Sequence, residues 1–282
     1  MNERICMITG ATSGIGKAAA LALAGMDFRL VLVCRNRGKG EKVIAEIRER
    51  TGNMMTELMI ADMMHLPSIK ALVSEFSKKY DRLHVLINNA GGIFMDRSVT
   101  EEGIEISMAL NHFGPFRLSS LLLDKLKTSA PARIINVNTA GHYMGKKKVF
   151  TDFELLKKYR GMRSYGNSKL CSLLYTFHLA RELEGTGVTV NAMHPGLVRT
   201  GFGKNNSSSF LMKLFDPFMV LFGISAEKGA DTMIYLASSD EVEGISGKYF
   251  IKRRPARVSK NALNREFENR VMEYSRSVAF SE

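Results

Sequence analysis

Short apolar segments alternate with segments of helical periodicity through the first half of the chain, and this alternation constrains the fold more than any other feature. The apolar runs are apolar throughout rather than at every second residue, which is typical of strands buried on both faces of a sheet. Strands that alternate with helices predict a parallel sheet covered by helices. Seven strands are predicted: RICMIT (4–9), RLVLVC (29–34), ELMIA (57–61), HVLIN (84–88), RIINV (133–137), VTVNA (188–192) and KYFI (248–251).

No feature of the sequence separates one group of these elements from another. The 282 residues contain no linker and no low-complexity segment, so the sequence predicts one α/β domain over residues 1–282, with a doubly wound parallel sheet of about seven strands flanked by helices. Three segments fall outside the alternation. Residues 143–163, between the fifth strand and the SYGNSK helix, are polar and rich in Lys. Residues 201–225 contain an apolar patch interrupted by Pro217, and residues 256–279 form a predicted amphipathic helix with Leu263, Phe267 and Val271 on one side.

The formal net charge of +12 has three interpretations. Most Lys and Arg residues can belong to solvated faces, a few can hold an anionic ligand such as a phosphorylated cofactor, and attraction to acidic lipid or RNA is the weakest interpretation. A nucleic-acid-binding protein gathers its basic residues in one stripe, whereas local runs occur here only at Lys146–Lys148, Lys157–Lys158 and Arg253–Arg254. We therefore expect no nucleic-acid partner.

The sequence also carries indications about cellular location. No stretch approaches the roughly 18–20 apolar residues that a membrane span needs, and the first residues, MNERICMITG, lack the layout of a signal peptide. Cys6, Cys34 and Cys171 are scattered without the spacing of a metal site. We expect reduced thiols, no bound metal and a cytoplasmic protein.

A glycine-rich turn, TGATSGIG at Thr9–Gly16, follows the first predicted strand and opens the first helix. Gly10, Gly14 and Gly16 allow a sharp turn and the close approach of a pyrophosphate, and the helix N-terminus offers free N–H groups. Three glycines can also mark no more than a tight strand-to-helix turn. Their place at the first crossover of a parallel sheet favours a dinucleotide site.

The end of the second predicted strand indicates which dinucleotide. NAD sites usually have an Asp or Glu there, which holds the ribose 2′-hydroxyl. This chain has Cys34 and Arg35, with Arg37 and Lys39 close behind. A carboxylate would repel a 2′-phosphate, whereas a guanidinium can bind one through two hydrogen bonds and stack on adenine. An exposed basic loop is the alternative, but the pattern favours NADP over NAD.

Two further strand ends carry polar or small residues. Asp62 ends the third strand, where its carboxylate can accept a hydrogen bond from the adenine amino group, and Asn88–Gly91 (NNAG) ends the fourth, where small residues can pass beneath the adenosine. Each could be ordinary turn chemistry. Ligands of open parallel sheets lie along the carboxyl ends of successive strands, so the joint occurrence favours a binding site.

The segment SYGNSK (164–169) places Tyr165 and Lys169 four residues apart on a predicted core-facing helix over 165–184. This spacing puts both side chains on one helix face, one turn apart. A free tyrosine has a pKa of about 10, and lowering it by ~2–3 units requires ~3–4 kcal/mol. An ammonium about 4 Å away supplies about 4 kcal/mol at an effective dielectric near 20. The pair, beside a nicotinamide, can therefore act as acid and base in the interconversion of carbonyl and alcohol.

Taken together, these motifs resemble those of the short-chain dehydrogenase/reductase family, and specifically its retinol-dehydrogenase-like branch. The resemblance runs from the first strand to about residue 250 in the family's order and spacing, and implies a single-domain Rossmann fold. It rests on Thr9–Gly16, Asp62, Asn88–Gly91, Asn111 in LNHFGPF, RIINVNTAGHY, Tyr165–Lys169 and HPGLVRT at 194–200.

The resemblance implies a role for each matched position. Tyr165 would be the catalytic acid/base, Lys169 would hold the nicotinamide ribose and lower the tyrosine pKa, and Asn111 would anchor a water of a proton relay. Cofactor contacts would come from Tyr165 and Lys169 and from residues at strand ends. The latter are Gly10, Thr12, Ser13, Gly14, Ile15, Gly16, Arg35, Asn36, Asp62, Met63, Asn89, Ala90, Gly91, Pro195, Gly196, Val198 and Thr200. Relatives often form dimers through helices corresponding to 111–127 and 165–184, so the resemblance also implies a homodimer or homotetramer.

One position departs from the family pattern. The family generally has two serines after the fifth strand, of which the second polarises the substrate carbonyl, whereas this chain has Asn138 and Thr139. Thr139 keeps a hydroxyl group, so we expect it to be catalytic. Its extra methyl group stiffens χ1 and crowds the pocket, which predicts slower or narrower activity.

The substrate is predicted to be apolar, because residues 201–225 fall where relatives carry a lid over the substrate. The apolar side chains of residues 201–225 could instead pack on the core or on a neighbouring subunit, or make shallow contact with a membrane. Most retinol-active relatives carry an N-terminal membrane anchor, and none is recognised in this sequence. Retinol is therefore not the favoured substrate. The leading hypothesis is an NADP(H)-dependent oxidoreductase acting on an aldehyde, ketone or alcohol. The alternative is a non-catalytic NADP-binding sensor, and a basic nucleic-acid-binding protein is third.

Overall fold

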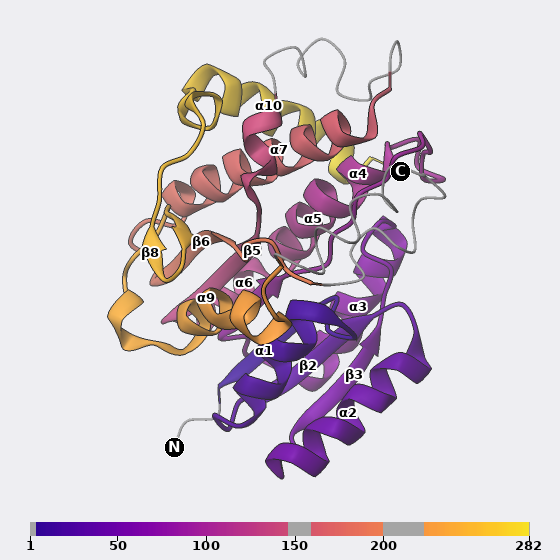
Figure 1. The fold of residues 1–282 in the computed structure, drawn as a ribbon, viewed down its shortest axis with the longest axis vertical. Coiled ribbons are helices and arrows are strands. Elements are labelled where there is room, and N and C mark those ends of the chain that lie inside the picture. The colour runs from indigo at the N-terminus through magenta and orange to yellow at the C-terminus, as the bar shows by residue number, and fades with distance from the viewer. Residues whose placement is uncertain (1–3, 146–158, 200–222, 282) are drawn as a thin grey trace.

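The computed structural model describes residues 4–145, 159–199 and 223–281, and these form one layered α/β unit around a twisted sheet (Figure 1). In this part of the chain the sheet has eight strands in the order β3-β2-β1-β4-β5-β6-β7-β8. All neighbouring pairs are parallel except β7 and β8. The strands are β1 (Ile5–Thr9), β2 (Arg29–Cys34), β3 (Thr56–Ile60), β4 (Val85–Asn88), β5 (Ala132–Val137), β6 (Val188–His194), β7 (Tyr249–Ile251) and β8 (Arg254–Pro255).

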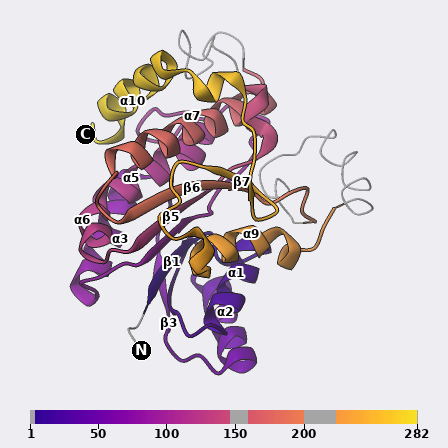
Figure 2. The same ribbon diagram turned by 90° about the vertical axis from the view of Figure 1, so that its left-hand side faces the viewer.

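Helices cover both faces of the sheet, and each face has its own hydrophobic core. One layer contains α1, α2 and α9, and the opposite layer contains α3, α5, α6, α7 and α10 (Figures 1 and 2). The helices are α1 (Gly14–Ala24), α2 (Arg37–Thr51), α3 (Leu66–Lys79), α4 (Ile106–Met108), α5 (Gly114–Leu121), α6 (Leu123–Thr128), α7 (Gly161–Glu182), α9 (Ala226–Ser238) and α10 (Arg265–Ala279), with a π-helix, η1 (Ala109–Phe113), and 3₁₀ helices η2 (Ala140–Met144), η4 (Asp240–Val242) and η5 (Lys260–Leu263).

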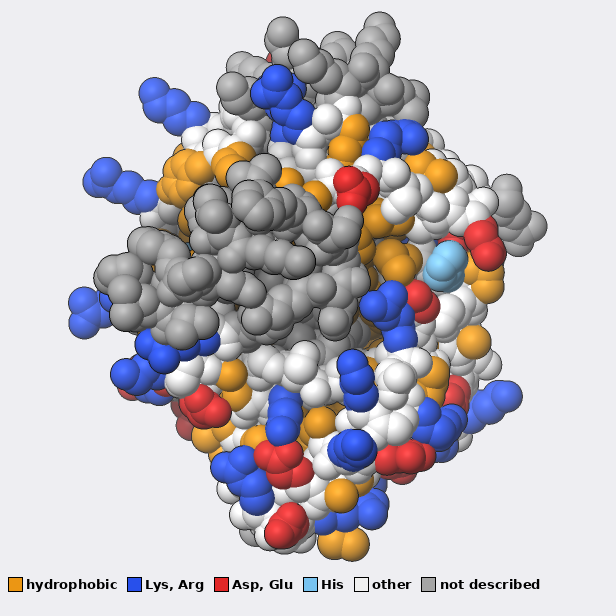
Figure 3. Space-filling model, turned by 45° about the vertical axis from the view of Figure 1, so that its right-hand side comes forward, with side chains coloured by type: hydrophobic (Ala, Val, Ile, Leu, Met, Phe, Trp, Pro, Cys, Tyr) orange, Lys and Arg blue, Asp and Glu red, His pale blue; other side chains and the backbone are white. Residues whose placement is uncertain are grey.

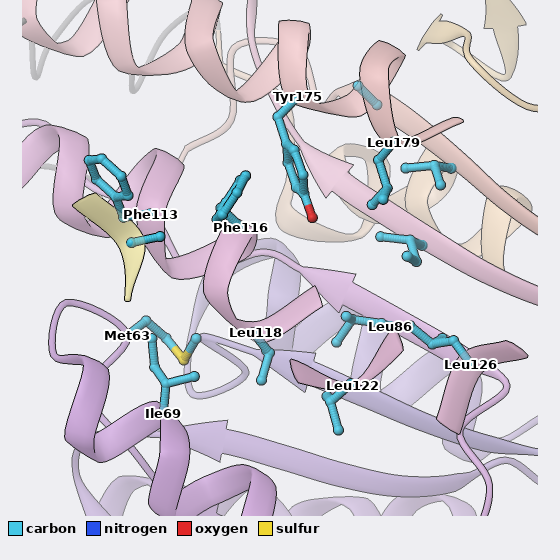
Figure 4. Packing of buried hydrophobic residues seen from close by; sticks show 14 of the residues in the cluster. Met63, Ile69, Leu86, Phe113, Phe116, Leu118, Leu122, Leu126, Tyr175 and Leu179 are labelled. Carbon is cyan, nitrogen blue, oxygen red and sulfur yellow. The ribbon is translucent and has the colours of Figure 1, made fainter. Parts of the chain in front are cut away.

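The core between the sheet and α5 and α7 is rich in aromatic rings. Phe116 of α5 and Tyr175 of α7 point toward one another with ring centroids 4.8 Å apart (Figure 4). Both side chains are buried, as is Phe113 of the π-helix. Offset and tilted aromatic pairs of this kind stabilise a core beyond the area that they bury. The packing fixes α7 against α5.

All seven predicted strands are present at the predicted places, and the sheet has the predicted doubly wound parallel order. The eighth strand, β8, was not predicted, because its two residues are exposed and carry no apolar pattern. It turns back antiparallel on β7 through Lys252 and Arg253, which have positive φ angles of 50° and 61°. This pair of left-handed residues makes the tight hairpin turn.

The predicted C-terminal helix over 256–279 begins later than expected. The helix α10 starts at Arg265, where the side chain of Asn264 accepts a hydrogen bond from the N–H of Phe267 at 2.9 Å. Phe267 and Val271 are buried as predicted, but the prediction for Leu263 is wrong, since it lies in η5 with its side chain 67% exposed. An Asn N-cap stops the helix from extending backward over the 3₁₀ turn.

The helix α10 lies along α7 and α5 (Figure 2). Its buried Glu268 pairs with Arg181 of α7, Ser275 bonds His112 of the π-helix at 2.7 Å, and the carbonyl oxygen of Ala279 accepts a bond from buried Arg117 of α5 at 2.7 Å. The outer faces of α5 and α7 are therefore partly covered by the chain's own C-terminal helix.

Basic residues do not form a stripe on the face drawn in Figure 3, where Lys and Arg side chains are interspersed with Asp and Glu. This distribution agrees with the interpretation of most charges as solvated faces. Within the described residues no helix has both the length and the apolar character needed to span a bilayer.

Candidate active site

The candidate site residues lie at the carboxyl ends of β1, β2, β3, β4, β5 and β6, together with the two helices that carry Asn111 and Tyr165. These strands are neighbours in the sheet, so their ends form one continuous edge. The edge passes the point where strand order reverses, between β1 and β4, which is where open α/β sheets bind ligands.

The glycine-rich turn joins β1 to α1 at the predicted place. Gly10 and Gly14 have positive φ angles of 68° and 54°, which side chains rarely adopt. A Cβ atom on Gly16 would lie 2.4 Å from Asn89 Nδ2 and 2.5 Å from Gly10 O. The N-cap of α1, Ser13, makes no side-chain capping bond, and the first turn contains no acidic residue. This leaves N–H groups of α1 for an anion.

Asn89 lies at the predicted place, but its amide group is bound to the turn. Its Nδ2 donates to Thr9 O at 2.8 Å and to Gly10 O at 3.0 Å, while its backbone N–H donates to Thr9 Oγ1 at 3.0 Å. The side chain therefore holds the end of β4 to the glycine-rich turn. Contact with a cofactor would come from the backbone of Asn89 and from Ala90 and Gly91.

Gly91 leaves room for the two polar side chains beside it. A Cβ atom there would lie 2.9 Å from Asn111 Oδ1 and 3.5 Å from Lys169 Nζ. The first distance is shorter than Cβ atoms tolerate, so only glycine fits here without a shift. The end of β4 thus joins the phosphate part of the site to Asn111 and Lys169.

The structure brings Arg35 and Asp62 together at the ends of β2 and β3. An oxygen of the Asp62 carboxylate lies 3.5 Å from a guanidinium nitrogen of Arg35, and the Arg35 side chain is 61% exposed. The other carboxylate oxygen accepts the N–H of Met64 at 2.9 Å. Asn36 caps α2 by accepting the N–H of Lys39 at 2.9 Å. Arg35 thus lies just after the end of β2 with most of its side chain exposed, and Met63, next to Asp62 in the chain, is buried.

Asn111 lies in the π-helix η1, a rare wide turn that is frequent at functional sites. Its Oδ1 accepts the N–H of Gly92 at 3.0 Å, and its Nδ2 donates to Gly92 O at 2.9 Å and to Ser168 Oγ at 3.1 Å. The side chain is therefore fixed between the segment after β4 and the Tyr165 helix.

Tyr165 and Lys169 lie one turn apart in α7, as predicted, and both are buried, with exposed fractions of 5% and 4%. The ammonium nitrogen of Lys169 lies 6.0 Å from the centroid of the Tyr165 ring and donates to the carbonyl oxygen of Val137 at 2.9 Å. The main-chain carbonyl of Lys169 accepts a bond from Asn138 Nδ2 at 2.9 Å. The end of β5 therefore holds this turn of α7 in place.

The predicted lowering of the Tyr165 pKa depends on the charges of Lys169 and of a bound nicotinamide, and it stays a prediction. Burial raises the pKa of Tyr165, and a hydrogen bond with Thr139 opposes that shift only in part. Burial also lowers the pKa of Lys169 to about 8. Both shifts follow from removing a charged form from water, an effect that opposes the predicted lowering of the Tyr165 pKa.

Thr139 is positioned by hydrogen bonds to its hydroxyl and to both of its backbone polar groups, among them a bond from the N–H of His142 to its carbonyl oxygen at 3.3 Å. Its Oγ1 accepts the N–H of Gly141 at 2.7 Å, its N–H donates to Asn138 Oδ1 at 2.8 Å, and its carbonyl oxygen bonds His142 Nδ1 at 2.7 Å. Its hydroxyl group also shares a hydrogen bond with Tyr165. The threonine in place of the family's serine thus has its hydroxyl beside the candidate acid/base.

The segment after β6 reaches back toward the glycine-rich turn. Gly196 has a positive φ of 84°, and Val198 forms a parallel bridge with Ile224. A Cβ atom on Gly229 of α9 would lie 2.6 Å from Val198 and 2.8 Å from Ile15, so both side chains pack at this glycine. Pro195 precedes the turn, and Thr200 lies outside the described residues, as does most of the predicted lid (201–222).

A sequence model described as short chain dehydrogenase matches residues 4–209. The chain belongs to the short-chain dehydrogenase family. Among curated proteins, this short-chain dehydrogenase is 39% identical to retinol dehydrogenase 12 of Mus musculus, over 96% of this chain and 85% of that one. It is 39% identical to retinol dehydrogenase 13 of Homo sapiens over 86% and 75% of the two chains.

Solved structures share the fold of this short-chain dehydrogenase. A crystal structure of an uncharacterized protein from Mycobacterium paratuberculosis superposes with a TM-score of 0.77, 26% identity and coverage of 99% of this chain and 94% of that one. A variant of actinorhodin polyketide ketoreductase has a TM-score of 0.70 at 23% identity, covering 88% and 95% of the two chains.

Sequence reasoning missed three polar residues that hold the site of this short-chain dehydrogenase together. Ser168 bonds Asn111, and His142 bonds Thr139. Glu105, fully buried, accepts bonds from Ser107 N, Met108 N, Tyr159 Oη and Ser164 Oγ at 2.7–3.1 Å, and so links the helix before Asn111 to the residue before Tyr165. The sequence carries no signal for these roles, because each depends on burial and on hydrogen bonds to residues distant in the chain.

Proposed function

We propose that this chain is an NADP(H)-dependent oxidoreductase that interconverts a carbonyl group and an alcohol by hydride transfer at nicotinamide C4. The observation that carries the proposal is the convergence of three groups at one end of the sheet. The Tyr165 hydroxyl bonds Thr139, the Lys169 ammonium lies against Gly91, and the uncapped N-terminus of α1 adjoins the same edge. These are an acid/base, a cation and an anion cradle in one site.

The residues present fit a dinucleotide. A bound NADP(H) would supply the hydride, and the glycine-rich turn and the N-terminus of α1 would hold its pyrophosphate. Gly91 and the Gly196–Val198 segment would lie along its ribose and nicotinamide, with Lys169 on the ribose hydroxyls. The absence of Cβ atoms at Gly10, Gly16 and Gly91 supports this assignment, because each would meet neighbouring atoms at 3.0 Å or less.

In this mechanism Tyr165 moves the proton. Its hydroxyl donates a proton to the substrate oxygen during reduction and accepts one during oxidation. Thr139 donates a hydrogen bond to the same oxygen and stabilises the charge that develops there. The ammonium of Lys169 favours the phenolate form of Tyr165 after the proton has left, and Asn111 orders the polar path behind Lys169.

The start of α2 supports NADP rather than NAD. A helix N-terminus carries positive dipole charge, which favours acidic residues in the first turn. This 15-residue helix has no acidic residue there and begins with Arg37 and Lys39, directly after exposed Arg35. A phosphate group bound between them would account for like charges gathered at this point.

An apolar carbonyl compound or alcohol is the proposed substrate. Met144 of η2 and Met162 of α7 are exposed. The helix η2 directly follows Thr139, and α7 contains Tyr165. Exposed apolar side chains at a site indicate an apolar ligand. The relatives named retinol dehydrogenase support an apolar alcohol or aldehyde. The predicted lid would complete this surface.

The test is the oxidation of NADPH, followed by absorbance at 340 nm, with a panel of aliphatic and cyclic aldehydes and ketones. We expect turnover with apolar members of the panel and a lower kcat/KM with NADH. Binding of NADPH without turnover of any carbonyl or alcohol would instead support the non-catalytic sensor. No binding of either dinucleotide would contradict both functions.

A further inference from the structure

Residues 257–261, which follow the last strand and precede α10, are bonded to the loop after β5 at three points. Tyr143 Oη donates to Arg257 O at 3.0 Å, the N–H of Ser259 donates to His142 Nε2 at 3.2 Å, and Asn261 Nδ2 donates to Gly145 O at 3.1 Å. The loop is η2, which begins directly after Thr139. Residues 257–261, more than 110 residues away in the sequence, are therefore hydrogen-bonded to the loop that follows Thr139.

His142 is the central point of this contact, and its partners determine its tautomer. Its Nε2 faces a backbone N–H, which can only donate, so Nε2 must accept. Its Nδ1 lies 2.7 Å from Thr139 O, which can only accept, so Nδ1 carries the hydrogen. The ring is fully buried and packs edge-on against Tyr249 with centroids 5.1 Å apart. Burial lowers the pKa of His142, in agreement with a neutral ring.

The hydrogen bond to Thr139 acts on the backbone of that residue. A threonine side chain has little freedom at χ1 once its backbone is fixed, because two heavy atoms branch from Cβ. The N–H of Thr139 is held by Asn138 and its carbonyl by His142. Together with the hydrogen bond that the N–H of Gly141 donates to Thr139 Oγ1, these two bonds determine the direction of the Thr139 hydroxyl group.

We infer that His142, held by the N–H of Ser259, is a positioning residue that keeps the Thr139 hydroxyl directed at the substrate oxygen. This inference rests on the proposed function. It assigns a role in the reaction to residues 257–261, which lie beyond the part of the chain that matches the family model (4–209). His142 touches neither cofactor nor substrate in this assignment, and acts through Thr139.

The experiment compares four variants. His142→Phe keeps a ring of similar shape but removes both hydrogen bonds, and His142→Asn restores a donor at the position of Nδ1. Ser259→Pro removes the N–H at a residue whose φ of −63° suits proline. Ser259→Ala keeps the N–H and is its matched control, since the Ser259 hydroxyl has no hydrogen-bond partner among the described residues.

We expect His142→Phe to lower kcat by about ten- to a hundred-fold with the Kd for NADPH unchanged, as misplacement of a reacting group does. His142→Asn should recover most of kcat. Ser259→Pro should lower kcat by a smaller factor, and Ser259→Ala should behave as the wild type. A kcat of His142→Phe within twofold of wild type, or of His142→Asn as low as that of His142→Phe, would overturn the inference.

A second measurement does not depend on turnover. The ¹⁵N spectrum of the wild type should show His142 as one neutral tautomer with an unprotonated Nε2, and crystals of His142→Phe should show the Thr139 hydroxyl displaced. A protonated Nε2, or an unmoved Thr139, would overturn the positioning role. If the wild type shows no turnover but both of these results are obtained, the proposed function is contradicted. The hydrogen-bonded contact between His142, Thr139 and Ser259 would still be supported.

Discussion

The ammonium nitrogen of Lys169 lies 6.0 Å from the centroid of the Tyr165 ring, one helical turn away on α7. Both side chains are buried, and the ammonium group donates a hydrogen bond to Val137 O. A buried cation destabilises a fold unless it is well paired. Its presence here suggests that stability has been given up for function at this position.

Lys169→Met should therefore raise stability while it abolishes activity. The pKa of Lys169 is lowered from its ordinary value of 10.5 to about 8 by burial. Between these two pH values the unfolded chain binds a proton that the folded chain does not, so wild-type stability rises with pH across this window. The variant should be more stable by on the order of 2 kcal/mol below pH 8, after allowance for the lost bond to Val137.

Urea unfolding of both proteins from pH 6 to 10 measures this effect. The difference in the free energy of unfolding should be constant below pH 8 and should decline as the pH rises toward 10.5. A variant less stable than wild type at pH 7 would contradict the assignment of Lys169 as a costly buried cation.

Arg35→Asp should weaken NADPH binding by about ten- to a hundred-fold, because a charge-assisted bond to the 2′-phosphate contributes about 1.5–3 kcal/mol. Affinity for NADH should change little, since NADH lacks that phosphate. Titration of the two dinucleotides by fluorescence provides the comparison. Arg48→Asp, an exposed change at the far end of α2, is the matched control for net charge. Equal losses in both variants would assign the phosphate to another group, such as Ser13 or Lys39.

Thr139→Val should lower kcat by about a hundredfold, because it keeps the branched shape and removes the hydroxyl group that stabilises the reacting oxygen. Thr139→Ser should retain or increase kcat, since the crowding methyl group is lost. Steady-state kinetics with the best carbonyl substrate measures both. Similar kcat values for the valine variant and the wild type would make Thr139 a spectator.

The chain should be a monomer, contrary to the oligomer that the resemblance implies. The surfaces of α5 and α7, through which the resemblance implies pairing, are partly covered by α10, with Glu268 bonded to Arg181 and Ser275 to His112. A dimer through those helices would have to displace these contacts. Sedimentation velocity at micromolar concentration should give a single species near the mass of one chain, 31.4 kDa. A dimer at that concentration would mean that another surface is used or that α10 moves.

The strands and the glycine-rich turn could be predicted because their causes are local. A strand buried on both faces is apolar at successive positions, and β1 and β2 show this pattern directly. The turn needs positive φ angles, and glycine supplies them at Gly10 and Gly14. The i, i+4 spacing likewise placed Tyr165 and Lys169 on one face of α7.

What could not be predicted depends on contacts between distant residues. The pKa of Tyr165 is set by burial, which no spacing of residues reveals. The bond between His142 and Ser259 joins positions 117 residues apart. The start of α10 depends on which of several polar residues caps the helix, and Asn264 does so. Two-residue strands such as β8 have no periodicity to detect.

The central claim is that Tyr165 transfers the proton while a dinucleotide bound at the same edge of the sheet transfers the hydride. The most direct measurement is single-turnover oxidation of NADPH by wild type and Tyr165→Phe with one apolar aldehyde or ketone, alongside the Kd for NADPH. The account predicts a fall in rate of at least about a thousandfold, typical of the loss of general acid catalysis at a preorganised site, with the Kd within about twofold, since the lost hydroxyl makes little contribution to cofactor affinity. A phenylalanine variant that reduces the substrate at the wild-type rate would contradict it.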